Sequence, residues 1–370
     1  MALHTHKTWI EIDSQALLAN LGIFRAMLGR DTALLLVVKA NAYGHGLCEV
    51  ANLIAQSKEG KSVLFGVDSL EEALALKSRG IKNSIVILGY IPARLLSQAL
   101  YNKFHISIFN KETLAAINHI LDTAHAHPAP RLHLKIETGL NRLGFSVADL
   151  ASSRFPNLEG MYTHFADVED GASGFYKEQL VRFEEARVVL AARGIVPRYL
   201  HVASTAALMQ YPETHYNLAR LGIGLYGLSP LSRQHEAQSI QPVLSWKTRI
   251  AHIAMVKKGE SVGYDRAFVS DKDRSIGVLP VGYSDGFDRG LSGNGRVLIN
   301  GVVAPVIGRV CMNMVVVDIS EVAAVVGDEV VLIGKSHGKE VSASDIAQLL
   351  DTIHYEVVSR INPLIPRIIV

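Results

Sequence analysis

Apolar and polar positions alternate in two different ways along this chain. Over residues 34–240, short apolar runs are separated by amphipathic stretches that favour helices. One helix is expected to begin after Ser69, a capping residue, and another covers residues 175–193. Eight runs are expected to form strands: residues 34–38, 62–66, 84–89, 105–109, 132–137, 158–164, 199–202 and 216–220. This alternation predicts a (β/α)8 TIM barrel, with a doubly wound open sheet as the alternative.

The pattern becomes strand-rich after residue 241. Residues 245–256, 275–282, 296–301, 302–311, 314–320 and 327–334 favour strands joined by turns that contain Gly or Asn. Only residues 342–350 and 353–360 favour helices. We therefore predict an α/β domain over residues 1–240, the barrel, and a mainly β domain over residues 241–370. Residues 1–11 include a strand that the first domain could lend to the second.

Composition excludes several classes of partner. The 37 basic and 35 acidic residues give a net charge of +2, which offers no electrostatic argument for binding nucleic acid or a membrane. The two cysteines, Cys48 and Cys311, are far apart and form no metal-binding or disulfide pattern, which favours a reducing compartment. The N-terminal residues lack a signal-peptide pattern, and the apolar runs are too short to span a bilayer.

The segment VVKANAYGHG, residues 37–46, carries the most distinctive chemistry. Lys39 follows directly after an apolar strand, at its carboxyl end. Partial burial there lowers the pKa of the ammonium group and favours a neutral amine that can form a Schiff base. We interpret it as a covalent cofactor anchor; the alternative is an ordinary lysine that closes an edge strand. Other unusual polar residues fall late in predicted strands or just after them: Lys135, Arg142, His164, His201 and Arg220. Barrel enzymes build their sites at this end of the strands.

Two predicted helix starts offer an anion site. Ser204 follows one strand, and Gly222 and Ile223 follow the last, so both segments present backbone N–H groups. Simple helix capping is the alternative interpretation. Together with Lys39, these segments fit a cofactor that has both an aldehyde and a phosphate, which is pyridoxal 5'-phosphate (PLP).

Nine motifs carry a resemblance that covers nearly the whole chain. They are TWIEID, VVKANAYGHG, HLKIETGLNRLGF, MYTHF, HVASTAA, ARLGIGLYGL, VGYSDG, PVIGRVCMN and HYEVVSRINPLIPR. In this order they resemble the alanine racemase family of fold-type III PLP enzymes. The resemblance implies a cytoplasmic homodimer that interconverts L-alanine and D-alanine by a two-base mechanism and supplies D-alanine for bacterial peptidoglycan, with its active sites at the subunit interface.

The resemblance also implies a role for each matching residue. Lys39 would link to PLP as an aldimine and act as one base, and Tyr264 of the other subunit would be the opposite base. The remaining cofactor-binding residues would be Tyr43, Arg142, His164, His201, Ser204, Arg220, Gly222, Ile223 and Tyr355. The substrate would contact Arg142, Tyr283, Met312 and Asn313. Lys135 matches the family lysine that is carbamylated and positions Arg142. No metal is implied.

Two departures bear on the substrate. Asn313 stands where the family usually has Asp, and the sequence around Tyr264 reads VGYDR where the family commonly has Ser-Tyr-Gly. We predict alanine as the main substrate, with serine or a broader set of amino acids as the alternative. A decarboxylase of the same architecture and a PLP carrier without activity are further alternatives.

Overall fold

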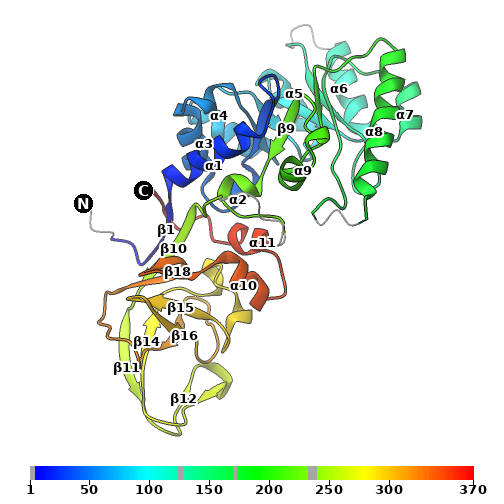
Figure 1. The fold of residues 1–370 in the computed structure, drawn as a ribbon. Coiled ribbons are helices and arrows are strands. Elements are labelled where there is room, and N and C mark those ends of the chain that lie inside the picture. Colours follow the sequence, from blue (N-terminus) through cyan, green and yellow to red (C-terminus); the bar gives the residue numbers. More distant parts are fainter. Residues whose placement is uncertain (1–4, 124–127, 170–172, 232–239) are drawn as a thin grey trace. The chain divides into compact units, whose positions relative to one another are not determined.

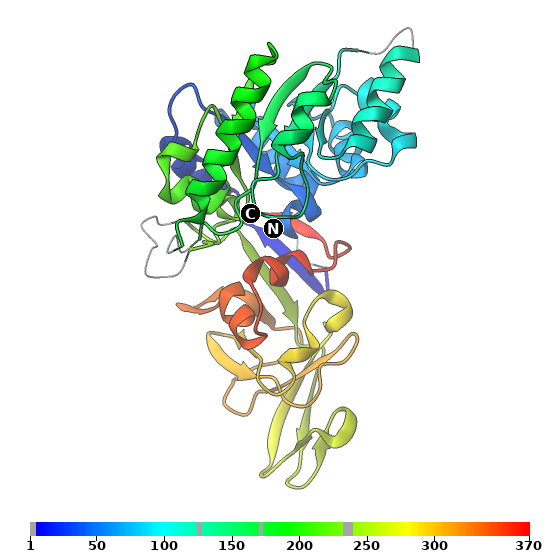
Figure 2. The same ribbon diagram turned by 90° about the vertical axis from the view of Figure 1, so that its right-hand side faces the viewer.

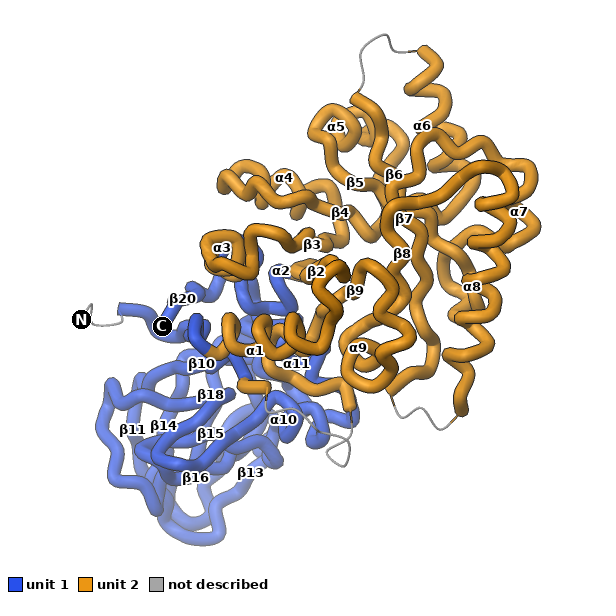
Figure 3. Tube along the Cα trace, turned by 45° about the horizontal axis from the view of Figure 1, so that its top comes forward, with its two compact units in different colours: residues 1–15, 41–49, 242–370 blue, residues 16–40, 50–241 orange. Residues whose placement is uncertain are grey.

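The computed structural model describes residues 5–123, 128–169, 173–231 and 240–370. The chain forms two compact units, which Figure 3 colours separately. The barrel unit comprises residues 16–40 and 50–241, and the β unit comprises residues 1–15, 41–49 and 242–370. The β unit is therefore assembled from three separate parts of the sequence.

Eight parallel strands form the sheet of the barrel unit (Figure 1). They are β2 (Ala33–Val37), β3 (Leu64–Val67), β4 (Ile85–Ile87), β5 (His105–Ile108), β6 (Arg131–Lys135), β7 (Leu158–Tyr162), β8 (Tyr199–His201) and β9 (Leu218–Leu221). Their order in the sheet is β8-β7-β6-β5-β4-β3-β2-β9. Most of their residues are buried, as expected where helices cover one face and the barrel core fills the other. The predicted fold class, a barrel with a mainly β second part, is confirmed.

Side-chain hydrogen bonds help to join the two end strands of this sheet. The Asn217 amide accepts from the backbone N–H of Leu200 (2.7 Å) and donates to the carbonyl of Arg198 (2.7 Å). The backbone N–H of Arg220 donates to the carbonyl of Ala203 at 3.3 Å. The Asn217 contacts lie at the amino ends of β8 and β9, whereas the Arg220–Ala203 bond lies at their carboxyl ends, where two of the predicted site residues lie.

Helices connect the strands and lie outside the sheet (Figures 1 and 2). They are α1 (Ser14–Ala26), α2 (Lys39–Tyr43), α3 (Leu47–Gln56), α4 (Leu70–Ser78), α5 (Leu96–Tyr101), α6 (Lys111–Thr123), α7 (Val147–Ser152), α8 (Phe175–Ala192) and α9 (Thr205–Gln210), with short 3₁₀ turns η1 (Glu59–Ser62), η2 (Ala93–Leu95), η3 (Pro212–Thr214) and η4 (Ile223–Tyr226). As predicted, Ser69 caps α4, because its side chain accepts a hydrogen bond from the backbone N–H of Glu72.

The main sheet of the β unit has the order β16-β15-β18-β10-β1-β20, and β19 also pairs with β18. Its strands are β1 (Thr8–Ile12), β10 (Leu244–Arg249), β15 (Arg296–Ile299), β16 (Val302–Pro305), β18 (Glu329–Ser336), β19 (Lys339–Val341) and β20 (Arg367–Ile369). Strand β1 pairs antiparallel with β10 and parallel with β20, so the first and last described strands of the chain are neighbours. Trp9 and Trp246 on β1 and β10 are buried in its core.

Smaller elements complete the β unit. A second sheet has the order β11-β14-β17, and β12 pairs with β13. These elements are β11 (His252–Val256), β12 (Ser261–Val262), β13 (Phe268–Val269), β14 (Arg274–Leu279), β17 (Val315–Asp318), α10 (Ala343–Leu349) and α11 (His354–Ser359), with 3₁₀ turns η6 (Tyr264–Arg266), η7 (Tyr283–Asp285) and η8 (Arg289–Leu291). The two helices lie within residues 342–350 and 353–360, where the sequence predicts them.

Candidate active site

The turn that begins at Lys39 has a strained backbone. Ala40, Asn41, Ala42 and Tyr43 have φ angles of 53°, 55°, 52° and 52°, so α2 is a short left-handed turn made of non-glycine residues. Each L-residue in this conformation costs roughly 1–2 kcal/mol. Strain of this kind persists only where surrounding contacts impose it, and it collects at functional sites.

Contacts within the β unit hold the end of this turn. Gly44, with φ +84°, leaves no room for a side chain, because a Cβ atom there would lie 1.9 Å from the carbonyl oxygen of Val358 on α11. Arg367 donates from Nε (3.1 Å) and Nη2 (2.9 Å) to the carbonyl of Gly44. The Asn41 side chain accepts from the backbone N–H of Leu47 at 2.9 Å. The strained segment is thus fixed at its carboxyl end.

Two lysines of the barrel unit differ in exposure. Lys39 Nζ lies 3.7 Å from Asp68 Oδ1, and 42% of its side chain is exposed. Lys135, at the end of β6, is buried. Burial, together with the positive charges of Arg142 and Arg220, lowers the pKa of Lys135 to about 8. A substantial fraction of Lys135 is therefore the neutral amine at mildly alkaline pH.

Glu137 organises the loop that carries Arg142. Its carboxylate accepts three backbone hydrogen bonds, from Gly139 (2.6 Å), Asn141 (2.9 Å) and Arg142 (3.2 Å). Burial alone would raise the pKa of Glu137, but these N–H groups stabilise the anion and the net effect is a lowered pKa. The loop is therefore closed around an ionised carboxylate, and the Arg142 side chain is exposed.

Arg220 is buried at the end of β9 and donates to several groups. Nη1 donates to Nδ1 of His201 (3.0 Å) and to its carbonyl, while Nη2 donates to the carbonyls of Thr163 (2.8 Å) and Val202 (2.9 Å). Nη2 also contacts Nδ1 of His164 at 3.3 Å. The guanidinium is therefore fixed in position and surrounded by acceptors.

The two histidines beside Arg220 are neutral. Burial and the charges of Arg220, Arg142, Lys135 and Lys39 lower the pKa of His164 to about 3. Burial also keeps the pKa of His201 well below its usual value. The positive charge of this region therefore resides on lysine and arginine side chains.

Thr205 links the two segments that were predicted to bind an anion. Ser204 is the N-cap of α9 and Gly222 is the N-cap of η4. The hydroxyl of Thr205 accepts from the backbone N–H groups of Gly222 (3.1 Å) and Gly224 (3.4 Å). A Cβ atom on Gly224 would lie 2.5 Å from Phe24, so the backbone passes here only because the residue is glycine. The Gly222 N–H is thus already bonded to a hydroxyl, while Ile223 begins the η4 turn.

The β unit brings together other predicted residues. The rings of Tyr43 and Tyr355 lie 6.2 Å apart. Tyr283 donates its backbone N–H to the carbonyl of Cys311 at 3.0 Å, which places it beside Met312 and Asn313. Met312 is 56% exposed.

Tyr264 also belongs to the β unit. It begins η6, in the hairpin between β12 and β13, and the residue is 68% exposed. The next residue, Asp265, has φ +60° and lies 3.7 Å from Arg309. The phenol therefore lies on a tight turn at the surface of the β unit and is exposed.

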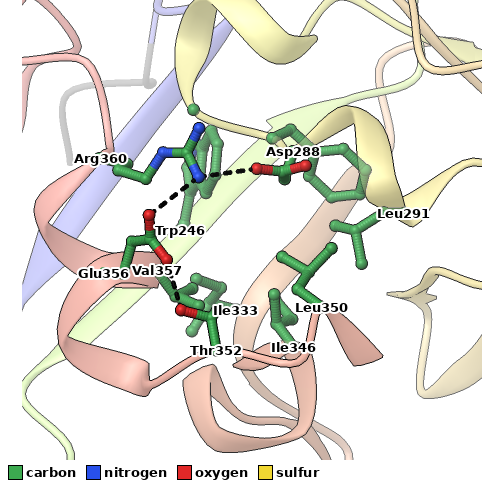
Figure 4. Close-up of a pocket in the computed structure, with 12 residues that line it drawn as sticks. Trp246, Asp288, Leu291, Ile333, Ile346, Leu350, Thr352, Glu356, Val357 and Arg360 are labelled. Carbon is green, nitrogen blue, oxygen red and sulfur yellow. Dashed lines mark hydrogen bonds and ion pairs between the residues drawn. The ribbon is translucent and has the colours of Figure 1, made fainter. Parts of the chain in front are cut away.

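A pocket in the β unit lies behind α11, the helix that carries Tyr355. Figure 4 shows Arg360 between Asp288 (3.0 Å) and Glu356 (3.3 Å), beside an apolar lining that includes Trp246 and Leu291. None of the predicted site residues lines this pocket. Its ion pairs tie α11 to the chain near η8 and so support the position of Tyr355.

Several residues around the predicted site were not singled out from the sequence. They are Asp68, which pairs with Lys39; His105 and His133, which extend from His201; Tyr162, whose ring stacks on His201; and Arg367. Histidines inside the apolar strand segments 105–109 and 132–137 were a visible signal. The other contacts depend on which residues the fold brings together. Among the described residues, no group of side chains could hold a metal ion, and no helix is long and apolar enough to cross a membrane.

The fold and these residues define a class of protein. A parallel eight-stranded barrel that gathers amines, guanidinium groups and buried imidazoles at the carboxyl ends of its strands is the architecture of a barrel enzyme. Here the barrel is combined with a separate β unit.

Comparisons with known proteins identify the family. The family model for the alanine racemase N-terminal domain matches residues 12–230, and that for the C-terminal domain matches residues 243–369. An alanine racemase of Symbiobacterium thermophilum is 36% identical over 368 residues, which cover 97% of this chain and 96% of that protein. The chain belongs to the alanine racemase family, a PLP-dependent family, as the sequence motifs predicted.

Solved structures agree with this assignment. The alanine racemase of Clostridium difficile 630 has a TM-score of 0.90 at 32% identity. The match covers 100% of this chain and 97% of that protein chain. The alanine racemase of Bacillus anthracis with bound L-Ala-P has a TM-score of 0.91 at 30% identity. The match covers 100% of this chain and 96% of that protein chain. The predicted class of activity, an amino-acid racemase, is confirmed.

Proposed function

We propose that this chain uses PLP to interconvert L-alanine and D-alanine, with Lys39 and Tyr264 as the two bases. The observation that carries the proposal is the placement of Lys39 next to a strained turn, in a barrel unit that also gathers Lys135, Arg142 and Arg220. We further propose that it works as a cytoplasmic homodimer and supplies D-alanine for bacterial peptidoglycan.

The residues present fit the cofactor. Its phosphate and phenolic oxygen are anionic, and Lys39, Lys135, Arg142 and Arg220 are near enough to one another for their charges to lower the pKa of the same histidine, His164. Ser204, Gly222, Ile223, Tyr43 and Tyr355 would hold the phosphate. When bound, PLP supplies an aldehyde for the Lys39 amine and an electron sink for the bond to the substrate α-hydrogen.

Racemisation needs one base on each face of the substrate α-carbon. Lys39 Nζ would take or return the proton on one face, and the Tyr264 phenolate on the other. The exposed position of Tyr264 in the β12–β13 hairpin supports its use by a second copy of the chain. This supports a homodimer with shared active sites.

Two arginines would hold the reacting groups. An arginine remains protonated, so Arg220 can only donate to the pyridine nitrogen, and the carbonyls around it keep it in place. Arg142 would bind the phenolic oxygen and the substrate carboxylate, and Glu137 fixes its loop. A carbamate on Lys135 would add a negative charge next to Arg142, and the lowered pKa of Lys135 favours the neutral amine that such a reaction requires.

Asn313 supports serine as a second candidate substrate. Its amide donates to the Ser284 hydroxyl (2.7 Å), and that hydroxyl donates to the carbonyl of Met312 (2.8 Å). An aspartate could not make the first of these bonds as a donor. The Asn313 carbonyl oxygen is an acceptor that a substrate hydroxyl can use, whereas the methyl group of alanine cannot.

The test is a racemase assay over a panel of amino acids with added PLP. We expect interconversion of alanine, its loss in Lys39→Ala, and a large loss in Tyr264→Phe. Tyr101→Phe, an exposed tyrosine of the barrel unit, is the matched control and should keep full activity. Release of CO₂ would favour a decarboxylase, and PLP binding without exchange of the alanine α-hydrogen in D₂O would favour a carrier; either result rejects the proposal.

A further inference from the structure

Three buried histidines form a continuous hydrogen-bonded chain inside the barrel unit. Nδ1 of His201 lies 3.0 Å from Arg220 Nη1, and Nε2 of His201 lies 2.9 Å from Nδ1 of His133. Nε2 of His133 lies 2.9 Å from Nδ1 of His105. Nε2 of His105 lies 3.4 Å from Nη1 of Arg131. The chain runs from the buried Arg220, across β8 and β6, to β5.

The fold makes special provision for this chain. His133 on β6 and His201 on β8 are separated by β7, and the residue of β7 in register with His133 is Gly160. A Cβ atom on Gly160 would lie 2.3 Å from Nδ1 of His133, so any side chain there would displace the imidazole. The ring of Tyr162 stacks on His201 with centroids 4.8 Å apart and planes 7° apart, which fixes the orientation of His201.

The donor count sets the direction of every hydrogen bond. Burial lowers the pKa of His105 to about 4 and keeps those of His133 and His201 well below the usual value, so each imidazole is neutral and carries one N–H. Because arginine only donates, Nδ1 of His201 must accept from Arg220. His201 then donates from Nε2 to His133, and His133 donates from Nε2 to His105.

This direction leaves one surplus donor at the far end. The N–H of His105 is on Nε2 and faces Arg131, which is also a donor. The opposite direction would place the same conflict between His201 and Arg220. Arg220 is buried and bonded to several carbonyls, whereas Arg131 is exposed and its contact is longer, 3.4 Å against 3.0 Å. The conflict is therefore least unfavourable at Arg131, where water can solvate the guanidinium.

We propose that His133 and His105 are positioning residues: as a one-directional chain of Nε2–H imidazoles, they keep Nδ1 of His201 an acceptor and thereby fix the Arg220 guanidinium. The consequence of this imidazole chain for catalysis rests on the proposed function, in which Arg220 binds the cofactor ring. The direction of the chain and the restraint on Arg220 do not depend on that function.

The first test needs no cofactor. In the full chain without PLP, labelled with ¹⁵N-histidine and ¹⁵N-arginine, two-bond ¹⁵N–¹H correlation spectra distinguish Nε2–H, Nδ1–H and doubly protonated imidazoles. We expect Nε2–H at His201, His133 and His105. An Nδ1–H form or an imidazolium at any of the three overturns the proposal.

Variants then cut or preserve the chain. His133→Leu removes its middle, and Gly160→Ala displaces the same ring without changing a histidine. Arg131→Gln removes the competing donor and provides a carbonyl that can accept from His105, so the tautomers should stay as they are. His215→Phe is the matched control, because His215 is another buried histidine but its Nε2 bonds only a backbone carbonyl, that of Leu208 (2.9 Å).

The two cutting variants should release Arg220. Hydrogen exchange at its guanidinium should rise by about tenfold or more, and kcat/KM for L-alanine should fall by about 10- to 100-fold, the range for a slightly misplaced group. Gly160→Ala gives the second reading if His133→Leu does not fold. Unchanged Arg220 exchange in the cut variants, or an equal change in His215→Phe, overturns the positioning role. If the wild-type chain racemises no amino acid, the proposed function fails, while the spectra and the exchange rates still decide this inference.

Discussion

Glu137→Gln gives the sharpest test of how the Arg142 loop is held. The amide oxygen can keep the bonds to Gly139 and Asn141, which share Oε1 in the wild type. The amide nitrogen replaces Oε2 and faces the N–H of Arg142, formerly at 3.2 Å, so that one charge-assisted hydrogen bond becomes a contact between two donors.

The size of the effect follows from this exchange. Loss of a hydrogen bond to a charged group costs about 1.5–3 kcal/mol, and partial exposure of Glu137 reduces this to about 1–2 kcal/mol. If the loop shifts to relieve the contact, Arg142 leaves its position, and the same free energy corresponds to about a 5- to 30-fold fall in kcat/KM. The assay is racemisation of L-alanine at saturating PLP, followed by optical rotation.

Glu178→Gln is the control, because Glu178 is an exposed residue of α8 whose ion pair with Arg182 spans 3.7 Å. It should change neither activity nor stability. Wild-type kcat/KM in Glu137→Gln, together with an unchanged midpoint of urea unfolding, would show that the three N–H bonds do not hold the loop.

The same carboxylate predicts a pH dependence. The folded-state pKa of Glu137 is lowered, so its contribution to stability is fully present above the ordinary pKa of a glutamate and is lost as the pH falls through the lower folded value. The difference in unfolding midpoint between the wild type and Glu137→Gln should therefore shrink as the pH is lowered below that ordinary value. A difference that grows with acidity contradicts the sign.

Three further predictions concern other parts of the site. Gly44→Ala should lose about 2–5 kcal/mol of unfolding free energy in urea, since it combines a left-handed φ with overlap of Val358, whereas Gly80→Ala, at φ +83° in open space, should lose only about 1–2 kcal/mol. In bicarbonate-free buffer, Lys135→Met should raise the urea concentration at the midpoint of unfolding. The increase should be largest below pH 8, because the wild type holds a buried ammonium group at that pH, and it should vanish as the pH approaches 10.5. Asn313→Asp removes the amide donor that bonds Ser284 and with it the contact that orients the acceptor oxygen at this position. The ratio of kcat/KM for alanine over serine should therefore rise by about 2- to 10-fold, and an unchanged ratio would remove the amide from the argument.

The barrel strands were predictable because of their surroundings. Parallel strands covered on both faces are continuous apolar runs, and each of the eight predicted runs contains or overlaps a strand of the barrel sheet. Helix starts with a capping serine were predictable for a local reason: Ser69 and Ser342 each accept from an N–H three residues on.

Features that depend on distant contacts were not predictable from the sequence. The left-handed turn after Lys39 would be unstable alone, and its contacts with Val358 and Arg367 come from residues more than 300 positions away. The imidazole chain is similar: His105 and His133 are visible in their strands, but only the strand register and Gly160 bring them into line. The motifs predict which residues form the site, and the fold supplies groups that hold several of those residues in place.

Strand β1 has a consequence for how the protein is made. Its two neighbours in the sheet are β10, which begins about 230 residues later, and β20, at the end of the chain. At a ribosomal rate of about 5–20 residues per second, roughly 10–50 s pass before β10, the first partner strand of β1, has been synthesised. Both edges of β1 remain unpaired until then. During that interval Trp9 and Ile10 belong to an unpaired apolar strand of the nascent chain, the kind of edge that attracts chaperones or other unfinished chains. Shortening the chain by its last few residues would prolong that exposure indefinitely on one side.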